Sequence, residues 1–405
     1  MLSTIIYRSH LADNLPIKEL ELMAGKANRK NGLLDVTGIL LFNGTHFFQL
    51  LEGPEKSVNS VYEAICADHR HHNLVELMRD YAPARRFGNV GMELFDLRQY
   101  NAGSVLQAVL DKGTSKYQLT YDDRALQFLR TFVESREREN YFEIPPAHHW
   151  KFVIDEDVLI AGDVQPRVNG GCDFAFQPIV DPLAQHTVSL EALVRDEDGG
   201  SPAEYFARFS QDEVYTADLQ SKKRAFALAR DLLKPGQTLA INLLPMSLVV
   251  VPGAVDFLLQ EIAVNGLVPE QVVVEVTENE IISRIDEFES AVKQLKSAGI
   301  SFALDDFGAG FGGLSLLARF QPEKIKIDLS IVRNVHKSGP KQAIIQALIK
   351  CCSALEIAVI AEGVEQAEEW MWLESAGISH FQGFLFARPA LNSVPAVAWP
   401  EQKII

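Results

Sequence analysis

The sequence lacks paired cysteines, blocks of positive charge and long apolar runs. Its cysteines, Cys66, Cys172, Cys351 and Cys352, have no CxxC spacing, which argues against a disulfide framework or a zinc site. The net charge of −16 excludes a broad nucleic-acid surface, because neutralising phosphates needs clustered Lys and Arg. No apolar run reaches the roughly 18 residues of a membrane span, and the N-terminal run MLSTIIYRSH is too short to contain the apolar region of a signal peptide. We therefore expect a cytoplasmic protein without a membrane segment or a nucleic acid polymer as partner.

The length of 405 residues and the 47% hydrophobic content suffice for two cores. Residues 1–98 alternate short strands and helices, with helical patterns over 16–30 and 54–67. The dipeptide Asn43-Gly44 predicts a hairpin turn. The expected order βαββαββ indicates a ferredoxin-like α+β domain with its helices on one face of the sheet.

Residues 99–150 predict a helical connector. Leu126, Leu129, Phe132 and Val133 form one apolar stripe of a helix, and the prolines at 145 and 146 end helix formation. Such a helix either caps the sheet of the first domain or contacts a second copy of the chain. A role in transmitting a signal is compatible with both.

Residues 151–405 alternate apolar strands with amphipathic helices. The strand candidates are FAFQPIV, TVSLEALVR, TLAINLL, VVVEVTE, SFALDDF, KIKIDLS, AVIAEGV and ISHFQGFLF. Helices between such strands are typical of parallel βα units, and this number of units predicts an α/β fold of the TIM-like (β/α)8 type. A doubly wound open sheet is the alternative, but no GxGxxG opens a helix after the first strand.

Polar residues stand at or near the end of each predicted barrel strand. The C-terminal ends of barrel strands form one face, so residues far apart in sequence meet there. Acids gathered on one rim raise each other's pKa and destabilise the fold unless cations compensate. Oxygen donors without His or Cys favour Mg²⁺, Mn²⁺ or Ca²⁺ over structural zinc. The residues are Glu191, Asn242, Glu275, Asp305, Asp306, Lys326, Asp328, Glu362 and Gln382.

Asp305 is placed to bridge two ions while Asp306 binds one. Two ions about 3.5–4 Å apart stabilise both the attacking and the leaving oxygen of a phosphoryl displacement. Lys326 is then placed to hold the nucleophilic water. The glycines that follow Asp306 let the chain approach a ligand closely.

Eight strings follow one another between about residues 170 and 390: FQPIV, EALVR, INLLP, EVTE, LDDFGAGFGGLSLL, IKID, AEGVE and QGFLFARP. In this order they resemble the EAL domains, the cyclic di-GMP phosphodiesterases. The resemblance implies two Mg²⁺ or Mn²⁺ ions, cyclic di-GMP as substrate and a homodimer through the barrel. It implies metal ligands at Glu191, Asn242, Glu275, Asp305, Asp306 and Glu362, catalytic roles for Lys326, Glu362 and Gln382, and substrate contacts at Gln177, Leu193 and Arg195.

Ordinary structural roles compete with some of these assignments. Asn242 is also suited to cap a loop, Asp328 to cap the next helix, and Lys326 to face solvent between two isoleucines. Glu365 in AEGVE is a weaker member of the set. The residues 311–313, Phe-Gly-Gly, depart from the Tyr-Ser-Ser that is more usual in the family, although no ligand is lost.

A second set of residues lies within about 1–97: Tyr7 in IIYRS, Asn31 before DVTG, Gln49 in FFQLLEG, DHRHH at 68–72, and Met92. These residues resemble BLUF domains, blue-light sensors that bind FAD. A Tyr hydroxyl and a Gln amide on neighbouring strands can form a hydrogen-bond chain to one flavin edge, and an Asn can hold the other. Arg29 and Lys30, which precede Asn31, are expected to face the FAD phosphates. Val90-Gly91 replaces the Trp-Ser that often precedes the late Met.

The sequence therefore predicts a photosensor at 1–98, a connector at 99–150 and a phosphodiesterase barrel at 151–405. Blue light would regulate the hydrolysis of cyclic di-GMP to linear pGpG. One alternative is a light-responsive receptor that binds cyclic di-GMP without cleaving it. Another makes the first domain an interaction module without a chromophore.

Overall fold

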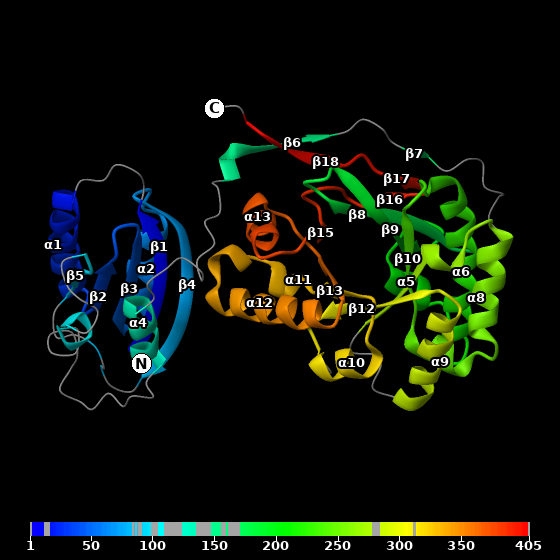
Figure 1. The fold of residues 1–405 in the computed structure, drawn as a ribbon, viewed down its shortest axis with the longest axis horizontal. Coiled ribbons are helices and arrows are strands. Elements are labelled where there is room, and N and C mark those ends of the chain that lie inside the picture. Colours follow the sequence, from blue (N-terminus) through cyan, green and yellow to red (C-terminus); the bar gives the residue numbers. More distant parts are fainter. Residues whose placement is uncertain are drawn as a thin grey trace. The chain divides into compact units, whose positions relative to one another are not determined.

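The computed structural model describes residues 2–11, 17–82, 85, 87, 91–98, 104–108, 124–134, 147–154, 159–160, 171–277, 284–310 and 313–403. The chain divides into two compact units (Figure 1). The first comprises Met1–Ile144 with Asn334–Ile344, and the second comprises Pro145–Arg333 with Ile345–Ile405. No helix of these ranges combines the length and apolar character that crossing a bilayer requires.

The first unit contains a five-stranded sheet in the order β4-β1-β3-β2-β5. Neighbouring strands are antiparallel, except that β2 and β5 are parallel. The βαββαββ order is confirmed, and the Asn43-Gly44 turn joins β2 to β3. The elements are β1 (Leu2–Leu11), α1 (Ile17–Leu33), β2 (Thr37–Phe42), β3 (His46–Pro54), α2 (Glu55–Cys66), β4 (His71–Ala82), β5 (Glu93–Asp96) and α4 (Arg124–Glu134).

The two faces of this sheet are covered by different helices. Strand side chains alternate between faces, and those at Tyr7 and Phe47 lie on the face covered by α1 and α2. On the opposite face, Phe48 packs against Phe132 of α4, with ring centroids 5.0 Å apart. The apolar stripe of the connector thus caps the sheet of its own chain. The two helices within 1–98, α1 and α2, lie on one face of the sheet as the sequence predicted, and α4 of the connector covers the second apolar face.

The second unit is a barrel of eight strands. Strands β9 to β15 follow one another as parallel neighbours, and β15 closes the barrel by pairing with β8. This closure excludes the open, doubly wound alternative. The strands are β8 (Asp173–Asp181), β9 (His186–Arg195), β10 (Thr238–Asn242), β11 (Val272–Thr277), β12 (Ser301–Phe307), β13 (Lys324–Ile327), β14 (Ala358–Ala361) and β15 (His380–Phe381).

One expectation about the barrel is wrong: β8 and β9 do not form a parallel unit. They are an antiparallel hairpin in which Gln177 lies opposite Glu191. The physical reason is the short turn at 182–185, since parallel strands need a crossover of about a dozen residues. The hairpin nevertheless brings these two side chains together at the start of the barrel.

Helices connect the barrel strands, and short additional strands lie beside them. The helices are α5 (Pro202–Phe206), α6 (Val214–Leu232), α7 (Pro245–Val250), α8 (Ala254–Val264), α9 (Ile285–Ser297), α10 (Gly313–Phe320), α11 (Leu329–Val332), α12 (Gly339–Ala354) and α13 (Ala367–Ser375). The short 3-10 helices are η1 (Ala147–His149), η2 (Pro269–Gln271) and η4 (Val335–Lys337). The additional strands are β6 (Trp150–Ile154), β7 (Leu159–Ile160), β16 (Ala390–Leu391), β17 (Ser393–Val394) and β18 (Ala398–Gln402).

Candidate active site and flavin pocket

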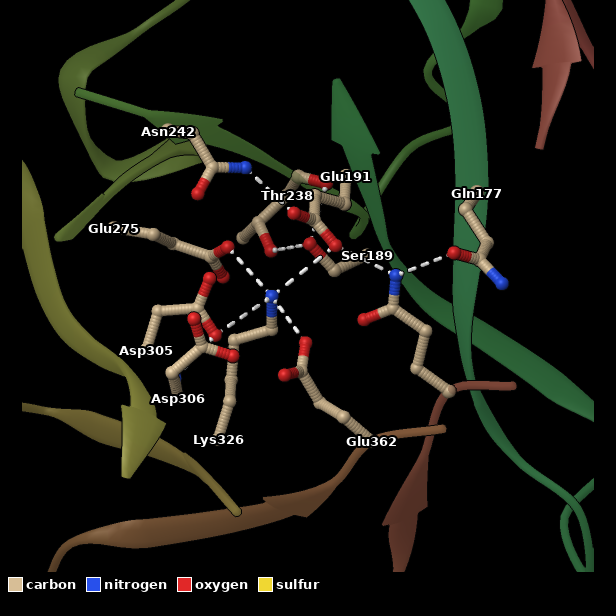
Figure 2. Close-up of polar contacts among 11 residues, drawn as sticks. Gln177, Ser189, Glu191, Thr238, Asn242, Glu275, Asp305, Asp306, Lys326 and Glu362 are labelled. Atoms are coloured by element: carbon tan, nitrogen blue, oxygen red, sulfur yellow. Dashed lines mark hydrogen bonds and ion pairs between the residues drawn. The ribbon is translucent and has the colours of Figure 1, made fainter. Parts of the chain in front are cut away.

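Most of the polar residues predicted at the strand ends meet at one end of the barrel, among them Glu191, Asn242, Glu275, Asp305, Asp306, Lys326 and Glu362 (Figure 2). Parallel registry aligns them, since Asn242 of β10 pairs with Glu275 of β11, and Ala240 pairs with Glu191 of β9. The backbone N–H of Glu362 donates to the end of β13, which places this acid directly after β14. The shared direction of the strands thus converts separate sequence positions into one cluster.

Lys326 lies at the centre of this cluster. Its side chain is 0% exposed, so the expectation that it could face solvent is wrong. Its Nζ lies 2.5 Å from Glu362, 2.8 Å from Glu275, 3.1 Å from Glu191 and 3.4 Å from Asp305. One buried ammonium group therefore faces four carboxylates, and it cannot neutralise all of them.

Amide side chains complete the polar contacts of Glu191. Asn242 donates to its Oε1 at 2.6 Å, and Gln382 donates to its Oε2 at 2.6 Å. Gln382 also donates to Oε1 of Gln177 at 3.0 Å, and Gln177 donates to the carbonyl of Ala387. Asn242 acts here as a partner of Glu191, so its placement does not favour the loop-capping alternative. These amides fix the direction in which the carboxylate points.

The pKa values report an excess of negative charge. Burial raises the pKa of Glu275 to about 8, against the lowering effect of Lys326. Burial likewise raises the pKa of Glu362 well above its usual value, and burial together with Asp305 raises that of Asp306 to about 6. For Glu191, burial is outweighed by Lys326 and the two amides, so its pKa is lowered. Without further cations, Glu275 therefore favours the protonated form at neutral pH.

The donor set fits hard divalent cations. Oxygen atoms of Glu191, Glu275 and Asp305 lie within 4.8 Å of one another, as do those of Asp305, Asp306 and Glu362. Asp305 belongs to both groups, which is the arrangement that a bridging ligand of two ions requires. Carboxylates without sulfur or imidazole are the ligands that Mg²⁺, Mn²⁺ and Ca²⁺ prefer.

Two further features suit ligand binding. Oε1 of Gln382 is buried and accepts no hydrogen bond from the described residues, a condition that an added donor would relieve. Asp306 has a φ of 51°, in the left-handed region that non-glycine residues adopt rarely and often at functional sites. The backbone N–H of Asp306 donates to Oδ1 of Asp305 at 2.8 Å, which holds the two carboxylates in place.

A cavity of about 430 Å³ opens beside the cluster. Its lining includes Leu193 of the EALVR string, together with Glu191, Asn242, Asp305 and Asp306. Leu193 therefore lies where the resemblance implied a substrate contact. An apolar wall beside a polar floor can accept a ligand that has both a flat organic part and an anionic part.

Sequence reasoning missed two residues of this cavity, Asp218 and Lys222 of α6. They form a buried ion pair of 2.6 Å. Oδ2 of Asp218 also accepts hydrogen bonds from the N–H of Leu244 and from the hydroxyl of Ser247. This ion pair fixes the segment that follows Asn242. The i, i+4 spacing of an acid and a lysine was visible in the sequence, but nothing there showed that the pair is buried.

Other predicted residues form their hydrogen bonds or ion pairs with groups outside the carboxylate cluster. Arg195 donates to the carbonyl of Val194, and burial lowers its pKa. Asp328 caps α11 by accepting from the N–H of Ser330, which confirms its structural alternative. Glu365 forms an ion pair with Arg333 at 3.1 Å. Phe311 and Gly312 lie outside the described residues.

The first unit holds a neutral hydrogen-bond chain. Tyr7 and Gln49 are register partners on β1 and β3, and the hydroxyl of Tyr7 donates to Oε1 of Gln49. Nε2 of Gln49 lies 3.3 Å from Sδ of Met92. Tyr7 is 0% exposed, and burial raises the pKa of its hydroxyl well above the usual value. The tyrosine therefore holds its proton in the chain Tyr7-Gln49-Met92.

This chain borders a cavity of about 250 Å³ between the sheet and the two helices α1 and α2. Aliphatic side chains such as Met23 and Ile65 line it beside Asn31 and Gln49. Apolar walls with amides at the edges fit the flat, polar-edged ring of a flavin. Nδ2 of Asn31 donates to the carbonyl of Gly91 at 3.4 Å. Residue 91 has to be glycine in this backbone, because a Cβ there would lie only 2.2 Å from the backbone oxygen of Asn28.

The basic lining of this cavity comes from α1 and from the residue that precedes β4. Lys26, Lys30 and Arg70 line it, whereas Arg29 is exposed and is not among the lining residues described. Of the two residues expected to face the FAD phosphates, Lys30 lines this cavity and Arg29 is not among its lining residues. Val90, which stands where many related domains have Trp, lies outside the described residues.

Comparison with known proteins identifies both units. Residues 163–389 match the EAL domain, and residues 2–93 match BLUF, the sensors of blue light using FAD. Over 405 residues, all of both chains, the sequence is 58% identical to the blue light- and temperature-regulated antirepressor BluF of Escherichia coli K12.

A solved structure resembles the whole chain. It is the manganese and cyclic di-GMP complex of BlrP1 from Klebsiella pneumoniae at pH 6, with 44% identity, a TM-score of 0.92 and full coverage of both chains. A further relative is the cyclic di-GMP phosphodiesterase PdeR of Escherichia coli K12, which is 43% identical over 126 residues. That match spans 31% of this chain and 18% of the relative.

Proposed function

The chain belongs to the EAL family and carries a BLUF domain, and from this premise we propose that it is a blue-light-regulated cyclic di-GMP phosphodiesterase. The product would be linear pGpG, formed by hydrolysis of one phosphodiester. The observation that carries the proposal is the convergence of four buried carboxylates on Nζ of Lys326, at 2.5–3.4 Å. A barrel whose only task was to bind a ligand would not need so much buried acid.

The ligands of the cations would be Glu191, Asn242, Glu275, Asp305, Asp306 and Glu362, with Asp305 shared. Two Mg²⁺ or Mn²⁺ ions, when bound, would stabilise the attacking and leaving oxygens and lower the pKa of the reacting water. The chain's own contribution begins with Lys326, whose Nζ can donate a hydrogen bond to that water and keep its lone pair directed at phosphorus. Glu362, at 2.5 Å from Nζ, orients the ammonium group and can accept the proton of the water.

Neighbouring side chains would hold the dinucleotide. Gln382 fixes Glu191 on one side and Gln177 on the other, which leaves its own buried Oε1 to accept a further hydrogen bond. Leu193 would contact a base, and Arg195 would contact a phosphate after rotation of its side chain. Each role is positioning, because the distances between reacting atoms decide the rate.

In the first unit, FAD would occupy the cavity beside Gln49. The flavin, when bound, would absorb blue light and exchange an electron with its surroundings. Tyr7 would supply an electron and a proton through its hydrogen bond to Gln49. Rotation or tautomerisation of the Gln49 amide would then exchange its donor and acceptor groups. The first contact to change would be the one between Nε2 of Gln49 and Sδ of Met92, which are 3.3 Å apart.

The remaining parts of the proposal concern organisation and partners. We assign the sensor to residues 1–98, the connector to 99–150 and the phosphodiesterase barrel to 151–405. The active form would be a cytoplasmic homodimer that associates through the barrel. The net charge of −16 supports a small dinucleotide bound through cations, and not a nucleic acid polymer, as the partner.

The test is the hydrolysis of cyclic di-GMP by the flavin-loaded chain with Mg²⁺ or Mn²⁺, in darkness and under blue light. Wild type and Asp305→Asn are compared, because the Asn removes the shared charge without changing the shape of the side chain. Turnover that rises with light and disappears in the variant supports the proposal. Equal turnover in darkness and under blue light would support the phosphodiesterase activity and reject its regulation by light.

A second candidate is a light-responsive receptor that binds cyclic di-GMP without cleaving it. The observation in its favour is the name of the 58% identical relative, which is called an antirepressor. Binding of cyclic di-GMP without any pGpG, with either metal and in either light condition, would establish the receptor and reject the enzyme. Purified protein without a flavin absorption band would reject the photosensor.

A further inference from the structure

Three histidines form a row across neighbouring strands at one end of the sheet in the first unit. His10 of β1 is the register partner of His46 on β3 and of His72 on β4. In sequence they are separated by 36 and 26 residues, so only the pairing of the strands brings them together. Side chains opposite one another on paired strands lie on the same face and within contact.

The rings touch. The His10 and His46 ring centroids lie 4.0 Å apart, and the His10 and His72 centroids lie 5.2 Å apart, with nearly parallel planes. Both ring nitrogens of His10 are buried and make no hydrogen bond with the described residues. Leaving a buried polar atom unsatisfied costs about 1–3 kcal/mol, so this ring is a place where a further ligand is expected.

The central ring is in the protonation state that coordination needs. Burial, and after it the neighbouring His46, His72 and Arg8, lower the pKa of His10 to about 3. The imidazole is therefore neutral at physiological pH, with one nitrogen lone pair available. The positive charge of Arg8 weakens binding of any cation here, so a moderate affinity is expected.

His46 has a partner that can fix its tautomer. Its Nδ1 lies 2.8 Å from the hydroxyl of Thr45. When Nδ1 donates its proton to this hydroxyl, Nε2 keeps its lone pair. Metal-bound histidines in general donate their second N–H to such a partner, which also fixes the ring orientation.

His72 gives access from solvent. It is exposed and lies on β4, which is an edge strand of the sheet. Among the described residues, the nitrogens of these three rings do not all lie within 4.8 Å of one another, the separation that a shared ion requires. Binding therefore requires a side-chain rotation, which an exposed residue on an edge strand can make without moving the core.

The row is distinct from both sites described above. Alternation along β3 places His46 and Gln49 on opposite faces of the sheet, so the row and the flavin cavity are on different faces. Imidazole nitrogen also selects other ions than the carboxylate cluster does, since it suits Zn²⁺, Cu²⁺ and Ni²⁺ more than Mg²⁺. Tetrahedral Zn²⁺ holds its ligand nitrogens about 2.0–2.1 Å from the ion.

We propose that His10, His46 and His72 form a binding site for a transition-metal dication of the zinc type on the sheet face opposite the flavin cavity. The ion would join the edge strand β4 to β1 and β3 through three neutral imidazoles. Water would complete the coordination on the exposed side.

The test is a calorimetric titration of the flavin-loaded, full-length chain with Zn²⁺ in excess Mg²⁺, which occupies the oxygen ligands of the barrel. Wild type is compared with His72→Gln and with His69→Gln. Both positions are exposed and lie three residues apart, but only His72 belongs to the row. We expect wild type and His69→Gln to bind one Zn²⁺ ion with similar affinity. The His72→Gln variant should bind this ion at least about tenfold more weakly.

X-ray absorption at the zinc edge gives an independent readout. Wild type should show scattering from three imidazoles, and His72→Gln should show fewer. Equal Zn²⁺ affinity and stoichiometry in wild type and His72→Gln would overturn the proposal, as would an equal loss in His69→Gln. If the titration difference is present but the absorption spectrum shows only oxygen or sulfur ligands, the ion lies elsewhere and the proposal is also wrong.

Discussion

The two units bury polar side chains beside a cavity in opposite ways. In the barrel, four carboxylates surround one ammonium group, and burial raises the pKa values of Glu275 and Glu362 against the lowering effect of Lys326. In the first unit, Tyr7, Gln49 and Met92 form a chain without formal charge. One site is short of positive charge, while the other is electrically balanced.

This difference teaches what each site can do. Surplus buried charge is tolerated only if a cation compensates it, so this cluster suits the proposed binding of cations and the proposed hydrolysis. A neutral chain of hydrogen bonds has two arrangements of similar energy, because an amide carries donors and an acceptor. Such a chain is suited to switching. Substitutions should therefore affect rate and ion dependence in the barrel, and the optical response in the first unit.

The largest effect is expected for Lys326→Met. It removes the ammonium group beside the reacting water, so kcat should fall by roughly 10²–10⁴. Steady-state hydrolysis of cyclic di-GMP measures this. Mn²⁺ should also raise the melting temperature of the variant more than that of wild type, because the carboxylates have lost their internal cation.

Lys324→Met is the matched control for Lys326→Met. Lys324 lies two residues earlier on β13 and on the same side of the strand, but outside the cluster. The Lys324→Met variant should have a kcat within a small factor of the wild-type value. A comparable fall of kcat in both variants would show that the effect comes from the strand and not from the charge at Nζ.

Asp218→Asn should follow in size. It leaves the buried ammonium group of Lys222 without its counter-charge, so the free energy of unfolding should fall by about 3 kcal/mol. Chemical denaturation gives this value. In the double variant Asp218→Asn/Lys222→Met most of the loss should be restored, because no unpaired charge is left. No recovery in the double variant would mean that hydrogen bonds to the segment after Asn242 matter more than the ion pair.

Tyr7→Phe tests the neutral chain. It removes the hydroxyl that donates to Gln49, and its cost in unfolding free energy should be only about 1 kcal/mol. The flavin should still bind, but blue light should no longer shift its absorption band, and the dark rate of the barrel should not change. Tyr62→Phe is the control, because its ring lies 5.5 Å from that of Tyr7 but outside the chain. A normal photocycle in Tyr7→Phe would contradict the assignment.

The smallest effect concerns Glu374 on α13. Burial raises its pKa from 4.5 to about 7, against the hydrogen bond from Trp370. The folded state thus binds the proton more tightly than the unfolded state, and this stabilising contribution is lost as pH rises from about 4.5 to 7. Glu374→Gln should flatten the pH dependence of the unfolding free energy in this range, whereas Glu368→Gln on the same helix should not. An unchanged slope would show that the carboxyl is better solvated than its burial indicates.

Much of this molecule was accessible from the sequence because the relevant signals are local. The apolar strand patterns and the Asn43-Gly44 turn predicted the order of elements in the first unit. The acids at the strand ends predicted an oxygen-ligand site, since parallel strands of a barrel must end at one rim. The stripe of Leu129 and Phe132 likewise predicted an amphipathic helix, and the structure shows that it caps the sheet.

What the sequence could not decide depends on distances between segments far apart in the chain. The sequence alone predicted the acids of the cluster, with Asn242 and Gln382, from their places at strand ends, and Gln177 followed from the resemblance to the EAL family. Only the tertiary structure placed Lys326 among four carboxylates, buried the pair Asp218 and Lys222, and made β8 and β9 antiparallel. The row of histidines also appears only when β3 and β4 pair with β1. Register and burial are properties of several segments together, so no single stretch of sequence contains them.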